Sequence, residues 1–131
     1  MYAMSYHFSK IVDCDFSTAI AKVTEELKKQ SFGIVTEIDM SETLKNKLNV
    51  DFRKYKILGA CNPNFAYRAL QLEDKIGTML PCNIVVQEIE RDKIEVSAVD
   101  PTASMMAIKN DELAQMAMEV RSSLKTVIDN L

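Results

Sequence analysis

The sequence predicts an α+β protein of two layers, in which one antiparallel sheet packs against helices on one of its faces. Several short segments alternate apolar and polar residues, as strands do. The clearest two, 82–89 and 93–99, are separated by a turn at 90–92 that is too short for the crossover between parallel strands. Residues 113–131 carry one continuous helical stripe of apolar side chains. These observations disfavour a doubly wound α/β fold.

The chain has 131 residues and a mass of 14.8 kDa, which is the size of one domain. We expect an N-terminal extension over residues 1–5 and a single α+β domain over residues 6–131. With 47% hydrophobic and 27% charged residues, the composition is that of a soluble globular protein. A chain of this length buries roughly two-thirds of its unfolded surface, so it needs no disulfide or metal ion to form a core.

The first part of the chain predicts two strands with a helix between them. Residues 6–12 alternate loosely, and residues 33–38 form the second strand. Between them, the segment 13–15 offers aspartate side chains that can cap a helix, and Gly33 is expected to end that helix. The apolar residues of the helix recur at helical spacing: Phe16, Ala19, Ile20, Val23 and Leu27.

A short helix and a more buried strand come next. Asp39 is expected to cap the helix, with Glu42 at its third position as in a capping box. Met40, Leu44 and Leu48 share one face of this helix. Residues 55–60 then form the third strand.

The remaining elements are two helices on either side of the hairpin. Asn62 followed by Pro63 is typical of a helix start, with asparagine as the cap and proline in the first turn. Pro101 is expected to end the second hairpin strand, because proline lacks the amide hydrogen that a central strand needs. The apolar side of the first helix is formed by Phe65, Ala66, Ala69 and Leu70, and that of the C-terminal helix by Leu113, Met116, Ala117, Val120, Leu124, Val127, Ile128 and Leu131.

Charge and cysteine content narrow the class of protein. The formal net charge is −3 and the pI is near 5.2, which argues against general nucleic-acid binding because that needs a cationic face. No apolar run reaches the roughly 18–20 residues of a membrane span, and the N-terminus has no secretion signal. Three widely spaced cysteines do not form the even set of a secreted disulfide scaffold. We therefore expect a cytoplasmic protein with reduced thiols that binds neither nucleic acid nor membrane.

Three segments carry a resemblance to a known family. Residues 58–63 (LGACNP), 77–83 (GTMLPCN) and 97–101 (SAVDP) resemble the family called domain of unknown function 302. The resemblance extends from about Tyr6 to the C-terminus. It implies a β-α-β4-α fold of the TATA-binding-protein type and self-association, and it implies no established biochemical activity.

The implied topology places several chemically interesting residues together. If the strands form an antiparallel meander, the end of the strand before Cys61, the start of the strand at Cys82 and the end of the strand before Asp100 meet at one end of the sheet. If the first strand pairs with 93–99, His7 lies at this end and Cys14 at the opposite one. The prediction is thus a thiol pair, Cys61 and Cys82, with Cys14 apart from it.

The thiol pair supports two interpretations. Cys61 precedes a helix N-terminus, whose amides favour the thiolate, and Cys82 follows Pro81. Two thiols so placed could form a reversible disulfide, carry a persulfide or bind a soft metal ion. Alternatively, both are small apolar residues that fill a tightly packed sheet end. A structural zinc site needs four protein ligands, so we expect no such metal site. The sequence leaves open whether the protein uses a cofactor.

Polar residues at the same end suggest a small ligand. Asn62, Asn83 and Asp100 could present donors and acceptors to it, although cap and strand-end roles also explain them. The preferred hypothesis is a homodimeric module that binds a small ligand at this end of the sheet. The alternatives are a thiol-dependent redox or sulfur-handling enzyme that uses Cys61 and Cys82, and a purely structural self-associating domain. Dimerisation is expected from the open sheet edge and from apolar residues outside the buried stripe, such as Met118.

Overall fold

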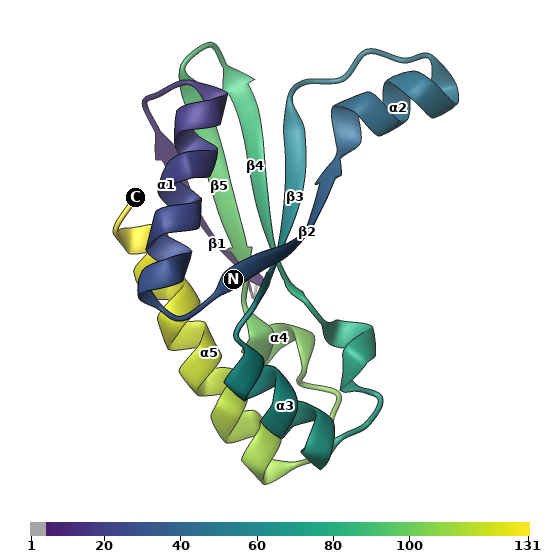
Figure 1. Ribbon diagram of the computed structural model, residues 1–131, viewed down its shortest axis with the longest axis vertical. Coiled ribbons are helices and arrows are strands. Elements are labelled where there is room, and N and C mark those ends of the chain that lie inside the picture. Colours follow the sequence, from purple (N-terminus) through teal and green to yellow (C-terminus); the bar gives the residue numbers. More distant parts are fainter. Residues whose placement is uncertain (1–4) are drawn as a thin grey trace, which may run out of the picture.

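The computed structural model describes residues 5–131 and confirms the predicted fold class (Figure 1). Its five strands form one fully antiparallel sheet in the order β1-β5-β4-β3-β2. The predicted N-terminal extension, 1–5, lies outside the described residues except for Ser5. The strands are β1 His7–Val12, β2 Gly33–Asp39, β3 Tyr55–Cys61, β4 Cys82–Glu90 and β5 Lys93–Val99.

Two helices cover one face of this sheet, and the others lie at its ends. The long helices α1 and α5 pack against the sheet, whereas α3 and α4 gather at the end where β3 and β5 finish (Figure 1). The sequence did not predict α4 or the short 3-10 helix η1. The helices are α1 Phe16–Lys29, α2 Met40–Leu48, α3 Pro63–Leu72, η1 Ile76–Met79, α4 Pro101–Ser104 and α5 Asp111–Asp129.

Every α-helix begins at an aspartate or asparagine whose side chain accepts a hydrogen bond from a backbone amide in the first turn. These caps are Asp15, Asp39, Asn62, Asp100 and Asn110. Each satisfies one of the amides that a helix N-terminus leaves without an internal partner. These five aspartate and asparagine side chains therefore serve as helix caps.

The end of α1 differs from the prediction. Gly33 does not terminate the helix; it begins β2. Ser31 takes the left-handed conformation instead, with φ of 64°. The amides of Ser31 and Phe32 donate to the carbonyls of Lys28 and Leu27, and Phe32 is itself buried. This is a Schellman arrangement, in which the buried Phe32 secures the turn from helix to strand.

Helix α5 provides most of the helical side of the core. Its buried residues are the first seven of the predicted stripe, from Leu113 to Ile128, and Leu131 is partly buried. Leu124 and Val127 are completely buried against the sheet and α1. The spacing of apolar residues therefore predicted the buried face of α5 correctly.

Helix α2 projects from the body of the protein (Figure 1). Asp39 caps it as predicted, by accepting a hydrogen bond from the amide of Glu42. None of its residues is buried, so its apolar face is not part of the core. Leu48 is 66% exposed, and Val50 and Phe52 in the following segment are also exposed. We call α2 and residues 49–52 the α2 arm.

The face of the sheet opposite α1 and α5 carries solvent-exposed side chains. Ile11 on β1 and Ile38 on β2 are about half exposed on this open face, among polar residues such as Ser9. His7 also lies there, where its Nδ1 is 2.8 Å from Oγ of Ser9.

Within the described range, 5–131, no helix is long and apolar enough to span a bilayer.

Candidate functional site

The strand register brings together most of the predicted site residues. Ala60 pairs with Cys82, which places Cys61 one residue beyond this pair at the end of β3. His7 pairs with Val99, so Asp100 follows at the same end of the sheet. Cys14 lies after β1, at the opposite end. The predicted separation of Cys14 from the other two thiols is therefore present in the structure.

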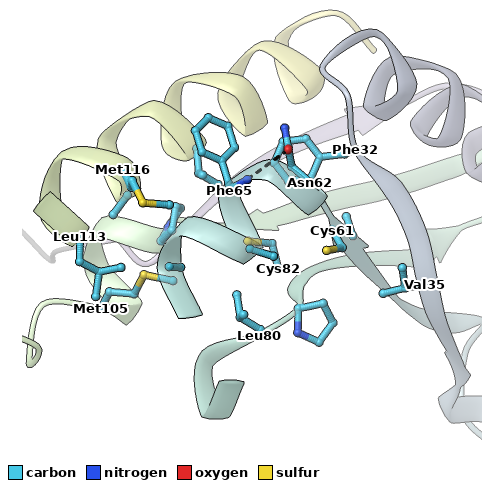
Figure 2. Close-up of a pocket in the computed structure, with 17 residues that line it drawn as sticks. Phe32, Val35, Cys61, Asn62, Phe65, Leu80, Cys82, Met105, Leu113 and Met116 are labelled. Atoms are coloured by element: carbon cyan, nitrogen blue, oxygen red, sulfur yellow. Dashed lines mark hydrogen bonds between the residues drawn. The ribbon is translucent and has the colours of Figure 1, made fainter. Parts of the chain in front are cut away.

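A cavity of about 280 Å³ opens at this end of the sheet (Figure 2). Its walls come from the ends of β2, β3 and β4, the segment before β4, and helices α3, α4 and α5. Nearly all of the lining is apolar. The residues that line it are Phe32, Val35, Ala60, Cys61, Asn62, Phe65, Ala66, Ala69, Leu80, Pro81, Cys82, Pro101, Met105, Leu113, Met116, Ala117 and Val120.

Local sequence explains why the cavity forms here. Asn62 caps α3 and turns the chain sharply from β3 into a helix, and Asp100 does the same between β5 and α4. Each of the two is followed by proline in the first turn of its helix, where the missing amide hydrogen costs nothing. Helices α3 and α4 therefore leave the sheet at the same end, and α5 packs against both of them. The cavity lies between these three helices and the end of the sheet.

The two thiols at the cavity have different environments. Cys82 is only 7% exposed, and burial, with a smaller contribution from the nearby Cys61, raises the pKa of the Cys82 thiol to about 11. Cys61 is half-buried. Both are free cysteines in the structure. Because a thiolate is the reactive form, Cys82 is poorly suited to act as a nucleophile at neutral pH.

The three polar candidates do not converge on one ligand position. Oδ1 of Asn62 accepts hydrogen bonds from the amides of Asn64 and Phe65, so its acceptor serves the cap. Asn83 is exposed on the open face, because its neighbour Cys82 occupies the helix side and side chains alternate along a strand. The predicted polar site of Asn62, Asn83 and Asp100 is therefore not assembled around the cavity.

Asp100 has a structural role in addition to its cap. Its Oδ1 accepts hydrogen bonds from the amide and hydroxyl of Thr102, and its Oδ2 lies 3.2 Å from Nε of Arg121 on α5. Burial by itself would raise the pKa of Asp100, but these hydrogen bonds and the Arg121 charge outweigh it, so the pKa lies below its usual value. The Arg121 guanidinium also lies 5.0 Å from the ring centre of Phe8. Together these contacts tie α4 and α5 to the edge of the sheet.

Sequence reasoning missed the helical wall of the cavity. Met105 and Met116 both line the cavity, together with Leu113. A signal for this wall exists in the sequence, since Asp100-Pro101 repeats the cap-and-proline pattern of Asn62-Pro63. Leu70, predicted to be on the apolar side of α3, is 44% exposed and does not line the cavity. His7 does not line it either.

The thiol environments predict an order of alkylation. In the native protein at pH 8, we expect iodoacetamide to modify Cys61 before Cys82, because with a pKa of about 11 only roughly one Cys82 thiol in a thousand is ionised. Mass spectrometry of peptides over a time course and a pH series measures this order. Labelling of Cys82 at the rate of Cys61 in the native protein would contradict the prediction. Labelling of Cys14 alone would indicate that both other thiols are inaccessible core residues.

Comparisons with known proteins agree with this fold. A family model described as "Domain of unknown function DUF302" matches residues 8–131. The chain is also similar to a solved structure described as the crystal structure of uncharacterized conserved protein DUF302 from Bacillus stearothermophilus. The two share 27% sequence identity with a TM-score of 0.88, over 96% of this chain and 98% of that chain. No curated protein matches the sequence.

Proposed function

The chain belongs to the DUF302 family, and because that family is described as having no known function, we propose one from the cavity. The protein is a binding module for a small, mainly apolar molecule at the end of the sheet where β3 ends and β4 begins. The observation that carries the proposal is the composition of the cavity wall. Aliphatic, aromatic and thioether side chains dominate it, and the carboxamide oxygen of Asn62, its polar side-chain acceptor, is already engaged in a cap.

The size and position of the cavity also support a ligand. Its volume of about 280 Å³ is near the lower end of the roughly 300–1,000 Å³ that is typical of small-molecule sites. Val35, which lines it, is 61% exposed, so the cavity has access to solvent. A hydrocarbon group that enters would be removed from water, which contributes about 25 cal/mol for each Å² of apolar surface buried.

A thiol-dependent enzyme is the second candidate, and Cys61 is the residue that favours it. Its half-buried sulfur lies on the cavity wall, immediately before the cap of α3. Cys82 would be its partner in a disulfide formed at the expense of an external disulfide oxidant, and the high pKa of Cys82 makes Cys61 the thiol that attacks first. A purely structural domain remains the third interpretation, and it predicts that no small molecule binds.

We predict that filling the cavity weakens ligand binding. Ala66 on α3 lines the cavity, and Ala66→Trp is expected to lower the affinity for an apolar fluorescent dye by at least about tenfold, or 1.4 kcal/mol. Dye titration measures the affinity. Tyr67→Trp is the matched control, because Tyr67 is adjacent on the same helix but 66% exposed and outside the cavity. Absence of saturable dye binding to the wild type would favour the structural interpretation, and equal losses in both variants would contradict binding in this cavity.

We also propose that the module works as a homodimer whose contact includes the α2 arm. The arm presents Leu48, Val50 and Phe52 to solvent, and the open sheet face beside it presents Ile38. With strands about 4.8 Å apart and about 3.4 Å rise per residue, one face of this sheet covers only about 600 Å². A stable dimer buries about 800 Å² on each partner, so the arm is needed in addition to the sheet.

Sedimentation equilibrium tests the dimer. We expect wild type at micromolar concentration to have twice the 14.8 kDa chain mass, and Leu48→Lys to shift it toward the monomer because a charge would then be buried in an apolar contact. Met118→Lys is the control, since Met118 is 62% exposed on the outer side of α5. A monomeric wild type would contradict the proposal. Dissociation by Met118→Lys alone would place the contact on α5 instead of the arm.

A further inference from the structure

The cavity wall contains four sulfur atoms from separate segments of the chain. Cys61 ends β3, Cys82 begins β4, Met105 follows α4 and Met116 lies on α5. Among the described residues that line this cavity, none is histidine, aspartate or glutamate. The side-chain oxygen in this lining, Oδ1 of Asn62, already accepts two backbone hydrogen bonds. The chemistry available in the cavity is therefore that of soft ligands.

We propose that Cys61 and Cys82 form a binding site for a soft monovalent metal ion of the copper(I) class, with the Met105 and Met116 thioethers on the facing wall. Thiolate and thioether sulfur select copper(I) over hard cations such as Mg²⁺ and Ca²⁺, which require oxygen ligands. A structural zinc ion takes four ligands, commonly thiolate and imidazole, and this cavity has two thiols and no imidazole. The donor set thus favours copper(I) over the commoner metals.

The placement of the two thiols supports a shared ion. The register pairs Cys82 with Ala60, and Cys61 follows at the end of β3, so the two thiols meet through the cavity they both line and not through a shared sheet face. Both thiols line the same cavity, and Figure 2 shows Cys61 and Cys82 on one part of its wall, with Met105 and Met116 on another. Cys14, at the other end of the sheet, is outside this set.

The surroundings suit a metal ion that must be shielded from water. Cys82 is buried and Met116 is only 3% exposed, whereas Cys61 is half-buried beside the exposed Val35. An ion can therefore enter from the side of Cys61 and be held with Cys82 in the apolar interior. The inference concerns the sulfur end of the cavity, and it does not depend on an apolar molecule occupying the remainder.

Competition for copper(I) tests the site. The whole chain, reduced with a thiol-free phosphine under anaerobic conditions, is titrated against a chromogenic copper(I) chelator, and zinc is titrated separately. We expect one copper(I) ion per chain and weaker binding of zinc. Cys61→Ser and Cys82→Ala should each lower copper(I) affinity by at least about a hundredfold, since even residues that only support metal ligands contribute about 10–100-fold. Cys14→Ser is the matched control and should leave the affinity unchanged.

Two further variants keep the test decisive. If Cys82→Ala fails to fold, the copper(I) test rests on Cys61→Ser. Cys61 is partly exposed, so this position tolerates a polar replacement more readily. Met116→Leu conserves volume and should weaken binding by about tenfold if the thioether supports the ion. Wild-type affinity in the Cys61→Ser variant, or an equal loss in Cys14→Ser, would overturn the proposal. Dye binding without copper(I) binding refutes only this inference, and copper(I) binding without dye binding refutes only the proposed function.

Discussion

Replacing Leu124 with alanine is expected to lower the free energy of unfolding by about 2–5 kcal/mol. Leu124 is completely buried in the middle of α5, where it packs in the core between the sheet and α1. Its removal loses apolar burial and leaves a cavity that the surrounding strands cannot fill. Because small domains are stable by only about 5–15 kcal/mol in total, the loss is a large fraction of the stability.

Urea denaturation followed by circular dichroism measures this change. The matched control is Met118→Ala on the same helix, where the side chain is 62% exposed and the expected change is within about 0.5 kcal/mol. A loss below about 0.5 kcal/mol for Leu124→Ala would mean that this side of α5 faces solvent. That result would contradict the packing of the two layers.

Replacing Gly59 with alanine is expected to be the second large destabilisation, at about 1–3 kcal/mol or more. A Cβ atom at this position would lie 2.0 Å from Oγ1 of Thr36 and 2.5 Å from Cγ of Pro81. The proline ring has little freedom to move, so β3 and the segment before β4 would have to separate. The cause is space alone, because no glycine in the described part of the chain has a positive φ.

Gly77→Ala provides the control for this substitution. A Cβ atom on Gly77 would meet no atom within 4 Å, so only a small change is expected. Since Pro81 also lines the cavity, Gly59→Ala should weaken dye binding as well as stability, whereas Gly77→Ala should leave both nearly unchanged. Equal stability of the two variants in urea would show that Thr36 and Pro81 can move to make room for a Cβ atom at position 59.

Local signals explain why so much of the fold could be predicted. Asp39 and Asn62 cap helices as their sequence contexts indicate, and the short turn after Glu90 joins β4 and β5 as an antiparallel pair. The apolar stripe predicted the buried face of α5 because apolar residues repeat at the helical period when one face of a helix packs against the core. Gly33 was misinterpreted because Ser31 took the left-handed position that glycine usually occupies.

The candidate site was only partly predictable. The register that brings Cys61 beside Cys82 follows from the antiparallel order, and that placement was predicted. The apolar cavity was not, because Asp100-Pro101 marks only the start of α4, whereas the wall also depends on how α5 returns to this end of the sheet. The position of Asn83 on the open face follows from the alternation of side chains along β4, which the grouping of Asn83 with Asn62 did not include.

The α2 arm can unfold separately from the rest of the protein, because the two regions differ in local stability. Since α2 buries no side chain, little free energy separates its folded form from a locally unfolded one. Its amide hydrogens are expected to exchange with deuterium through brief opening of the arm, whereas those in the centre of α5 exchange only when the whole body unfolds. In the proposed dimer, local opening of this kind would let the arm change its conformation against the second chain while the sheet and the cavity stay folded.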